Sequence, residues 1–506
     1  GTGSWYSNNW TSRKAVTVQE SLINEDLTNF PVYVNLADLG STFFSNVQSN
    51  GADIRVTASD GVTEVPYELV SINTGGQTGE LYFKGSSISS TTNTVFYVYY
   101  NNSSAAAYSA TSTYGSQNVW TNNYSAVYHF NQDPSGTAPQ MLDSTANARH
   151  GSSAGTVGAG KLVAAKIGNG LDFVGTAGDY TVDFPTFGIS GTGSYTFSVW
   201  LKTGATTNGA FNDGAGTYMA DRTTGTNELA GLKVIAGNFA HQYRYNDGSG
   251  IGAVSGGAVS GSVWQYVTWG RSYNSNLFVS TNGTVSTAAD SATALTPPLM
   301  RFGGHQGNTS YAGLADELRI SSTTRSAGWL SAEYNNQATS STFYAVAAAE
   351  SQVTRAFTDT NATVLGNLII ESGQATFPTG ILSIGGSLDN DGRFNSNAGT
   401  VRFNSTAGSE TIAAGSSTFA TVDFNSATGI FTVTENATAT VALTLTTASA
   451  FTLSSGRIFE STGTFSNAAT AAVPRSGLSL GGSENNPGNN SSIGCPGVAA
   501  QKTVDA

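Results

Sequence analysis

Residues 195–203 read YTFSVWLKT, and this stretch shows most clearly how the chain folds. Large apolar side chains stand at every second position from Tyr195 to Leu201. Successive side chains of a β-strand point to opposite faces, so the spacing predicts a strand with one buried face. Trp200 falls on the opposite face, together with Thr, Ser and Lys side chains.

The same two-residue alternation recurs along the whole chain, in short runs broken by Gly, Asn, Asp and Ser. Examples are RKAVTVQ (13–19), VFYVYY (95–100) and SNLFVSTNG (275–283). Asn282-Gly283 supplies residues that tolerate positive φ, as tight hairpin turns require. Helical periodicity is nearly absent, so the sequence predicts an all-β protein.

Composition divides the chain into four parts: residues 1–115, a β-sandwich that ends in a small-residue linker; 116–350, with all four histidines; 351–470; and a Gly/Asn/Ser-rich tail, 471–506. From about 358 to 470 there is no Trp, Tyr, His or Lys. Short apolar strands there alternate with Ser-Gly or Gly-Gly pairs at an irregular period. A β-solenoid and a small β-sandwich both fit this β-strand repeat.

The overall charge excludes several classes of function. The 506 residues include only 11% charged side chains, against a usual ~25%, and the net charge is −12. Without a basic patch we expect no nucleic-acid partner. No apolar run is long enough to span a membrane, and the N-terminus lacks signal-peptide features, so we expect an exported chain whose signal peptide has been removed.

Cys495 is the only cysteine, so no disulfide can form within the chain. It is a candidate for a bridge between subunits. An uncharged Gly, Ser, Thr and Asn surface suits proteins that pack side by side, because neighbours meet little charge repulsion.

Five motifs in order resemble the LamG-like, concanavalin A-type jelly roll of bacterial cell-surface proteins: AVYHFNQDPSGTAPQMLDSTANARHGSS (126–153), KIGNGLDFVG (166–175), YTFSVWLKT, WQYVTWGRS (264–272) and LADELRISSTTRSAGWLSAEYNNQ (314–337). NNWTSRKAVTV and VFYVYYNN resemble a domain of unknown function that often precedes such jelly rolls, and the C-terminal block is similar to strand repeats of large surface proteins. The resemblance implies two antiparallel sheets and a glycan or protein ligand, without implying an enzyme.

Asp316 and Glu317 are the carboxylate pair that most invites a catalytic interpretation, because laminarinase-type hydrolases share the jelly-roll shape. Retaining glycosidases need two carboxyl groups about 5–5.5 Å apart on either side of one sugar bond. Adjacent residues of a regular strand point to opposite faces, so this pair cannot serve one substrate if the strand is regular. We expect an architectural role, with Glu317 close to Arg319.

Oxygen-rich loops make calcium the one cofactor to consider, with Asp133, Asp143 and Asp316 as candidate ligands. The same Asp residues in loops also form Asx-turns without any metal. The histidines show no metal-binding spacing, and His129 is predicted to be a hydrogen-bonded structural imidazole. Glu68 follows Pro66, which suits an edge strand.

Glycan binding needs aromatic rings that stack on sugar faces, with polar groups beside them. The candidates in the predicted jelly roll are Trp200, His241, Tyr243, Tyr245, His305 and Tyr311. His241, Tyr243 and Tyr245 alternate on one strand face, which is either a binding face or core.

Three functions follow from these patterns. The first is a non-enzymatic extracellular surface protein, a self-assembling structural subunit of a filament, sheath or surface layer that displays a lectin-like domain. The alternative is a glycan-binding adhesin that acts as a single chain. A glycoside hydrolase has the least support, since it rests on shared fold alone.

Overall fold

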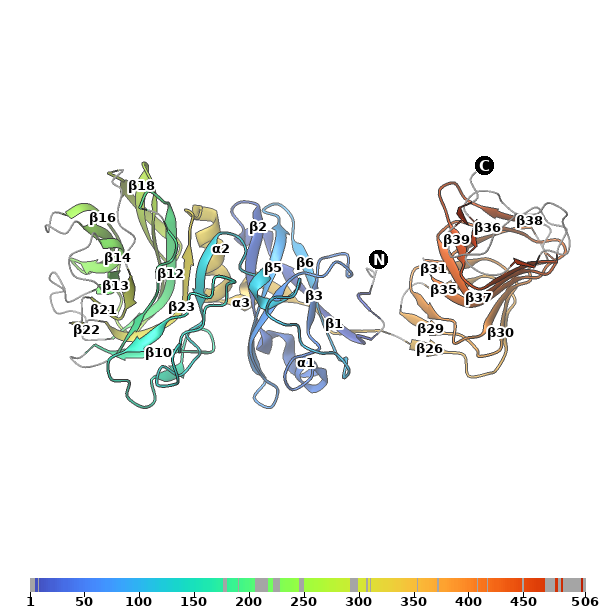
Figure 1. Cartoon of the computed structure of the whole chain (residues 1–506), viewed down its shortest axis with the longest axis horizontal. Coiled ribbons are helices and arrows are strands. Elements are labelled where there is room, and N and C mark those ends of the chain that lie inside the picture. Colours follow the sequence, from blue (N-terminus) through green and yellow to red (C-terminus); the bar gives the residue numbers. More distant parts are fainter. Residues whose placement is uncertain are drawn as a thin grey trace. The chain divides into compact units, whose positions relative to one another are not determined.

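The computed structural model describes residues 5–7, 9–175, 180–189, 191–204, 217–221, 228–244, 250–291, 299–305, 308–309, 311–352, 354–370, 373–406, 408–415, 417–447, 450–468, 478–480, 484–485 and 502–503. Strands dominate this part of the chain, which confirms the all-β prediction (Figure 1). The chain forms two compact units. We call Ser12–Glu350 the body, and Gly1–Thr11 with Ser351–Ala506 the solenoid unit. The boundary expected near residue 115 falls inside the body.

The first sandwich of the body is built by strands from both ends of the body. One sheet has the order β24-β1-β6-β3, with β25 also paired to β1, and the other has the order β2-β5-β4. The strands are β1 (Ser12–Val18), β2 (Leu27–Asn35), β3 (Arg55–Thr57), β4 (Tyr67–Asn73), β5 (Thr78–Ile88), β6 (Thr94–Tyr100), β24 (Tyr344–Val346) and β25 (Glu350–Ser351). Val346 of β24 lies opposite Val16 of β1, so the second sandwich is inserted between strands of the first.

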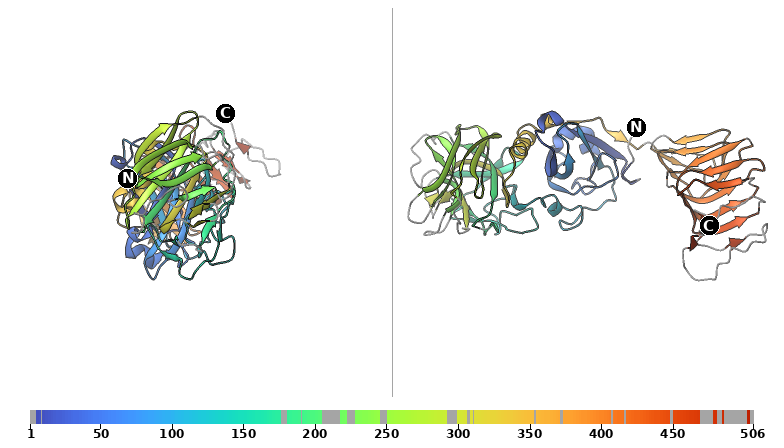
Figure 2. Two further views of the ribbon diagram at one scale, coloured as in Figure 1. Left: turned by 90° about the vertical axis from the view of Figure 1, so that its left-hand side faces the viewer. Right: turned by 90° about the horizontal axis from the view of Figure 1, so that it is seen from above.

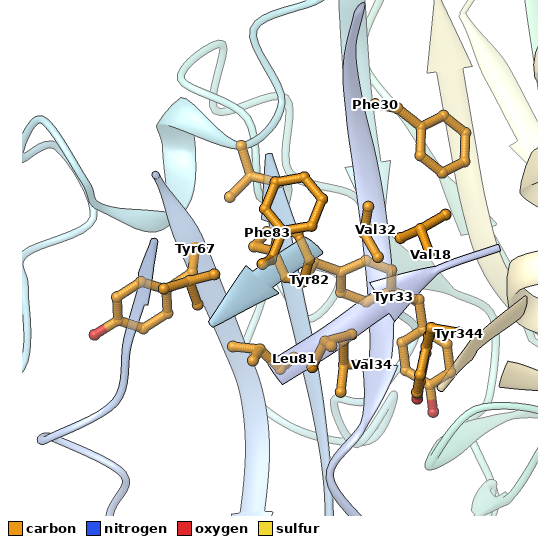
Figure 3. Close-up of a cluster of buried hydrophobic side chains, with 14 of the residues drawn as sticks. Val18, Phe30, Val32, Tyr33, Val34, Tyr67, Leu81, Tyr82, Phe83 and Tyr344 are labelled. Atoms are coloured by element: carbon orange, nitrogen blue, oxygen red, sulfur yellow. The ribbon is translucent and has the colours of Figure 1, made fainter. Parts of the chain in front are cut away.

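The core of the first sandwich is rich in aromatic residues. Figure 3 shows residues of β2 gathered beside residues of β5, with Tyr33 and Tyr82 at a ring-centroid distance of 5.2 Å. Phe83 of β5 meets Phe96 of the other sheet at 4.7 Å, which joins the two layers. Each such ring buries a large apolar area, so this region is held firmly.

The second sandwich consists of two antiparallel sheets around one apolar core. The first has the order β19-β18-β17-β12-β23-β10-β9, with β7 paired to β23, and the second the order β16-β15-β14-β13-β20-β11-β8. The strands are β7 (Tyr124–Tyr128), β8 (Ser152–Ala154), β9 (Leu162–Ala164), β10 (Asn169–Val174), β11 (Thr181–Asp183), β12 (Tyr195–Thr203), β13 (Thr217–Asp221), β14 (Glu228–Ile235), β15 (Asn238–Arg244), β16 (Gly250–Ala258), β17 (Trp264–Ser272), β18 (Asn276–Thr281), β19 (Thr284–Ala289), β20 (Met300–Phe302) and β23 (Ala312–Ser321), beside the small pair β21 (Gly304–His305) and β22 (Asn308–Thr309). Tyr195, Phe197, Val199 and Leu201 enter this core, as their alternation predicts.

Helix α2 separates the two sandwiches, where Figure 1 shows it beside β2 and β23. Its Gln337 accepts a hydrogen bond from the indole of Trp200 (2.7 Å), and its Asn336 bonds the backbone of β2 at Tyr33. Ser326 caps its N-terminus. Because α2 is buried on two sides, its sequence has no continuous polar face, and periodicity did not predict it. The helices are α1 (Gly40–Asn46), α2 (Ala327–Ala338) and α3 (Ser340–Phe343), with 3₁₀ turns η1 (Glu20–Leu22), η2 (Leu36–Leu39) and η3 (Ser116–Asn118).

The solenoid unit decides between the two alternatives for the C-terminal block: it is a parallel β-solenoid of about five turns (Figure 2). Its three faces have the orders β26-β29-β32, β27-β30-β33-β35-β37-β39-β41-β43 and β28-β31-β34-β36-β38, with β40 paired to β37 and β42 paired to β40. Equivalent residues of successive coils lie 19 to 24 positions apart, as in Val364, Ile384 and Phe403. The strands are β26 (Thr354–Ala356), β27 (Ala362–Val364), β28 (Leu368–Ile370), β29 (Gln374–Thr376), β30 (Ile381–Ile384), β31 (Leu388–Asn390), β32 (Arg393–Asn395), β33 (Thr400–Phe403), β34 (Ser409–Ala413), β35 (Thr418–Phe424), β36 (Ile430–Val433), β37 (Ala437–Leu445), β38 (Ala450–Leu453), β39 (Phe459–Ser461), β40 (Thr464–Asn467), β41 (Leu478–Leu480), β42 (Glu484–Asn485) and β43 (Lys502–Thr503).

Asparagine side chains join neighbouring coils at the corners of the solenoid. Asn361, Asn367 and Asn436 each accept a hydrogen bond from a backbone N–H in the next coil, at 2.7, 2.9 and 3.0 Å. These bonds satisfy backbone groups at corners, where the strand ladders are interrupted. The Asn-rich composition of this block therefore has a structural cause.

Candidate functional site

A β-bulge in β23 brings the two consecutive carboxylates to the same side of the sheet. Ser198 of β12 pairs with Arg319 and Trp200 pairs with Asp316, so two residues of β23 lie opposite one residue of β12. Glu317 has a φ of 54°, in the left-handed region that a regular strand does not use. The premise that the strand is regular was wrong, and both side chains are turned away from the core of the second sandwich.

Glu317 is the centre of a buried ionic cluster. Its Oε1 accepts from Nδ1 of His129 at 2.6 Å, and its Oε2 accepts from Nη2 of Arg319 at 3.0 Å. Arg319 also donates to Glu333 of α2 at 2.7 Å, and His129 donates to Glu68 of β4 at 3.3 Å. The cluster therefore connects both sandwiches with the helix between them, as the expected architectural role requires.

Aromatic rings enclose this cluster. The Tyr82 ring stacks on His129 at 5.2 Å, and the guanidinium of Arg319 lies 5.1 Å from the ring centres of both Tyr82 and Trp120. The Trp120 indole N–H donates to Glu68 at 2.5 Å. Cations over aromatic faces are stabilised most where water is excluded, so the enclosure strengthens the ionic contacts.

The cluster is charged despite its burial. Burial opposes ionisation of His129, but the carboxylates of Glu317 and Glu68 outweigh it and raise the pKa of His129 to about 10. Burial likewise opposes ionisation of Glu317, yet His129 and Arg319 lower its pKa to about 2. An anion thus lies between two cations, each hydrogen-bonded to it.

Asp316 is different from its neighbour. Burial, followed by repulsion from Glu317, raises the pKa of Asp316 well above its usual range. Its Oδ2 accepts from the backbone N–H of Ile167 at 2.7 Å. Its surroundings therefore favour the neutral form of Asp316, beside an ionised Glu317.

A carboxyl whose surroundings favour its neutral form, beside an ionised one, is the pairing that an acid–base mechanism uses. Here Asp316 is 0% and Glu317 is 1% exposed, so no substrate can reach either group. In this structure the two carboxyl groups make structural contacts: Glu317 bonds His129 and Arg319, and Asp316 bonds the backbone of Ile167.

The three candidate calcium ligands have different surroundings. Asp133 is exposed and accepts from the backbone and hydroxyl of Ser135 in an Asx-turn. Asp143 is buried and accepts from Thr145 and from backbone N–H groups, including that of Arg149 at 2.8 Å. Within the described ranges, no group of three or more His, Cys, Asp or Glu side chains is placed to hold a metal ion.

Three of the six candidate glycan-binding residues are buried, so their predicted role as exposed stacking surfaces is wrong in this structure. Trp200 is 2%, His241 0% and Tyr311 3% exposed. Lys166 lies 4.8 Å from the ring centre of Trp200. His241 lies between the carbonyl of Gly231 and the Tyr195 hydroxyl, and burial lowers its pKa to about 4. Rings enclosed in this way offer no face to a sugar.

The other candidates stay predictions. Tyr245 and Cys495 lie outside the described residues. Tyr243 and His305 belong to β15 and β21, but their side chains lie outside the description. The glycan-binding alternative therefore depends on Tyr243, Tyr245 and His305.

Sequence analysis missed the partners that complete the cluster. Glu68 was assigned only to an edge strand, and β4 is indeed the edge of its sheet. Glu333 is on a helix that periodicity did not predict, and Tyr82 is one of many strand aromatics. The available signal was the combination of Glu317 and Arg319, two cluster members on one strand, with a lone His129 on another.

Comparisons with known proteins leave the function to be argued from these residues. No protein-family model and no curated protein matches the sequence. Domain 4 of AbnA, a GH43 extracellular arabinanase from Geobacillus stearothermophilus solved with arabinotriose, is 18% identical over 41% of this chain and 97% of that domain, with a TM-score of 0.32. The binding domain of Paraclostridial Mosquitocidal Protein 1 is 11% identical (42% and 52% covered, TM-score 0.34). The botulinum neurotoxin serotype D ligand binding domain, solved with N-acetylneuraminic acid, is 13% identical (42% and 51%, TM-score 0.33). The chain thus spans about half the length of both toxin domains.

No helix among the residues that the structure describes has the length and apolar character needed to cross a membrane.

The two adjacent carboxylates should respond oppositely to neutralisation. Asp316→Asn supplies a neutral side chain of the same shape, and burial already favours the neutral form of Asp316, so we expect the body to be as stable as wild type at pH 7 or more stable. Glu317→Gln leaves His129 and Arg319 without their shared anion and should cost about 3–5 kcal/mol. Thermal unfolding followed by tryptophan fluorescence checks both; equal losses in the two variants would contradict this assignment.

The charge on His129 should make body stability fall at alkaline pH. Its folded pKa of about 10 exceeds the ordinary value of 6.5, so its contribution is complete below about pH 6.5 and is lost as the pH rises towards 10. We expect the difference in unfolding temperature between wild type and His129→Gln to shrink steadily over that range. A difference that stays constant from pH 6 to pH 10 would rule out a charged His129.

Proposed function

We propose that this chain is a non-enzymatic extracellular structural subunit of a filament, sheath or surface layer, in which the solenoid unit joins neighbours and the body displays a lectin-like jelly roll. The observation that carries this proposal is the open end of the solenoid. Strands β26, β27 and β28 are the terminal strands of the three parallel sheets. Within the described part of the chain, each pairs with a neighbour on one side only, and unpaired strand edges are templates for another chain.

The chemistry of the solenoid surface supports the same role. Thr432 and Thr452 are hydrogen-bonded hydroxyls on adjacent coils at 2.9 Å, and Thr447 bonds Asn425 at 2.6 Å. When two subunits meet, uncharged hydroxyl and amide groups can replace hydrogen bonds to water by hydrogen bonds to the other subunit with little change in free energy. Side-by-side packing of subunits then needs no charge complementarity.

The sealed cluster supports a non-enzymatic role. Asp316 and Glu317 were the best candidates for glycosidase chemistry, and both are inaccessible in the body. Glu317 has its hydrogen-bonding capacity taken by His129 and Arg319. A group held in this way contributes to stability and is withheld from a substrate.

Electron microscopy of the full chain at micromolar concentration tests the assembly. We expect regular filaments or sheets that persist from about 50 mM to 500 mM NaCl, because screening acts on charged contacts and hardly on hydroxyl, amide and apolar ones. Dispersed single particles at every concentration would overturn the proposal.

The non-enzymatic part has its own test. Incubation of the full chain with β-glucans should release no reducing sugar above the buffer control, with an active glucanase as the positive control. Sugar release that Glu317→Gln abolishes, in protein shown to be folded, would contradict the account.

A further inference from the structure

The first coil of the solenoid, residues 354–370, leaves apolar side chains half-exposed at its end. Its inward-facing residues Phe357, Ala362, Val364 and Leu368 are each only partly buried. Their counterparts in the second coil, Phe377, Leu382, Ile384 and Leu388, are buried to 1% exposure or less. The second coil is covered on both sides, whereas these four residues of the first coil keep partial contact with solvent; Ile370, at the end of the first coil, is buried.

The outward positions of the first coil are apolar too. Leu365 is 89% and Ile369 is 59% exposed. In the second coil the equivalent residues are Gly385 and Asp389. Terminal coils of solenoid proteins ordinarily carry a polar outer face that keeps them soluble. This coil has the opposite character, which is typical of a surface that another chain covers.

The far end of the solenoid is finished differently. There β43 pairs antiparallel with β41, with Ser479 opposite Thr503, on a face whose other pairings are parallel. An antiparallel strand at this position ends the parallel stack. The far end of one copy is therefore a poor match for the first coil of another.

The first coil of a second copy matches in full. The free edges of β26, β27 and β28 surround one coil of the solenoid. A partner can pair with all three only if it presents three strand edges at the same distances, as another solenoid coil does. A two-fold axis perpendicular to the solenoid axis reverses strand direction, so the strands of the two first coils would meet antiparallel, a geometry in which neighbouring edges exchange hydrogen bonds. Neither β27 nor β28 carries a charged residue, and β26 carries one, Arg355.

We propose that the first coil is a self-pairing surface through which two copies of this chain join end to end about a two-fold axis. The pairing buries Val364 and Leu368 as the second coil buries its own apolar residues, and it covers Ile369. This inference rests on the proposed structural function and names its partner and geometry: the two-fold pair is the unit from which larger assemblies grow.

The test compares one isoleucine and one valine that are equally exposed but lie in different coils. Ile369→Lys puts a cation on the edge strand β28. Within the chain, Asp389 of the next coil lies opposite this position and can pair with the lysine, so folding is preserved. In a two-fold pair, the lysines of the two copies repel each other and weaken association. Val441→Lys is the matched control, because Val441 is also 59% exposed but lies in β37, away from the first coil. Both full-length variants and wild type are measured by sedimentation velocity from about 1 to 50 μM, with circular dichroism to verify folding.

We expect wild type and Val441→Lys to form dimers or larger assemblies, and Ile369→Lys to weaken association at least tenfold. If Ile369→Lys associates as wild type does, the self-pairing surface is refuted while the structural function stands. Equal loss in the two variants would also refute it, because the effect would not be specific to the first coil. A wild type that stays monomeric throughout would refute both this inference and the proposed function.

Discussion

The body depends on one irregular residue. Glu317 adopts positive φ at a bulge, and the bulge places Asp316, Glu317 and Arg319 on the side of β23 that faces the first sandwich and α2. Without it, strict alternation would send Glu317 into the apolar core of the second sandwich, where an anion has no partner. A left-handed non-glycine residue costs on the order of 1–3 kcal/mol, which the contacts of Glu317 with His129 and Arg319 offset.

This arrangement explains why two sandwiches behave as one compact unit. Strand β24 returns to the first sheet after the second sandwich is complete, and α2 fills the space between them. Apolar packing is non-directional, so the hydrogen bonds and ion pairs of the cluster are what fix the position of one sandwich relative to the other. Each charged group has a defined partner on another element. Displacement of one sandwich would therefore leave a buried charge without its partner, which is strongly destabilising.

The solenoid unit follows the opposite logic. Its coils repeat, its interior is a stack of Phe, Val, Leu and Ile, and polar contacts such as that of Asn361 join one coil to the next. A stack of repeats can have any number of coils, so the terminal coils lack a neighbour on one side and leave part of the core uncovered. The ionic cluster of the body is buried and its charged groups are paired, whereas the first coil of the solenoid unit leaves apolar side chains partly exposed. This contrast is the reason to place assembly at the first coil.

Local patterns predicted much of this fold. The alternation in residues 195–203 fixes which side chains of β12 enter the core, and turn residues separate the strands. The solenoid was left open because parallel and antiparallel pairing give the same alternation within a strand. Trp200 was misjudged because α2, whose burial on two sides hides its periodicity, covers that face of the sheet. The ionic cluster could be anticipated only in part, since Glu68 and His129 lie on different strands and the bulge depends on tertiary contacts.

The central claim is that the buried cluster makes one cooperative body out of two sandwiches. Differential scanning calorimetry of the full chain tests it most directly. The account predicts two transitions, one for the body and one for the solenoid unit, with the body transition shifting as a whole when the pH is changed. Three separable transitions, with the two sandwiches melting independently, would contradict it.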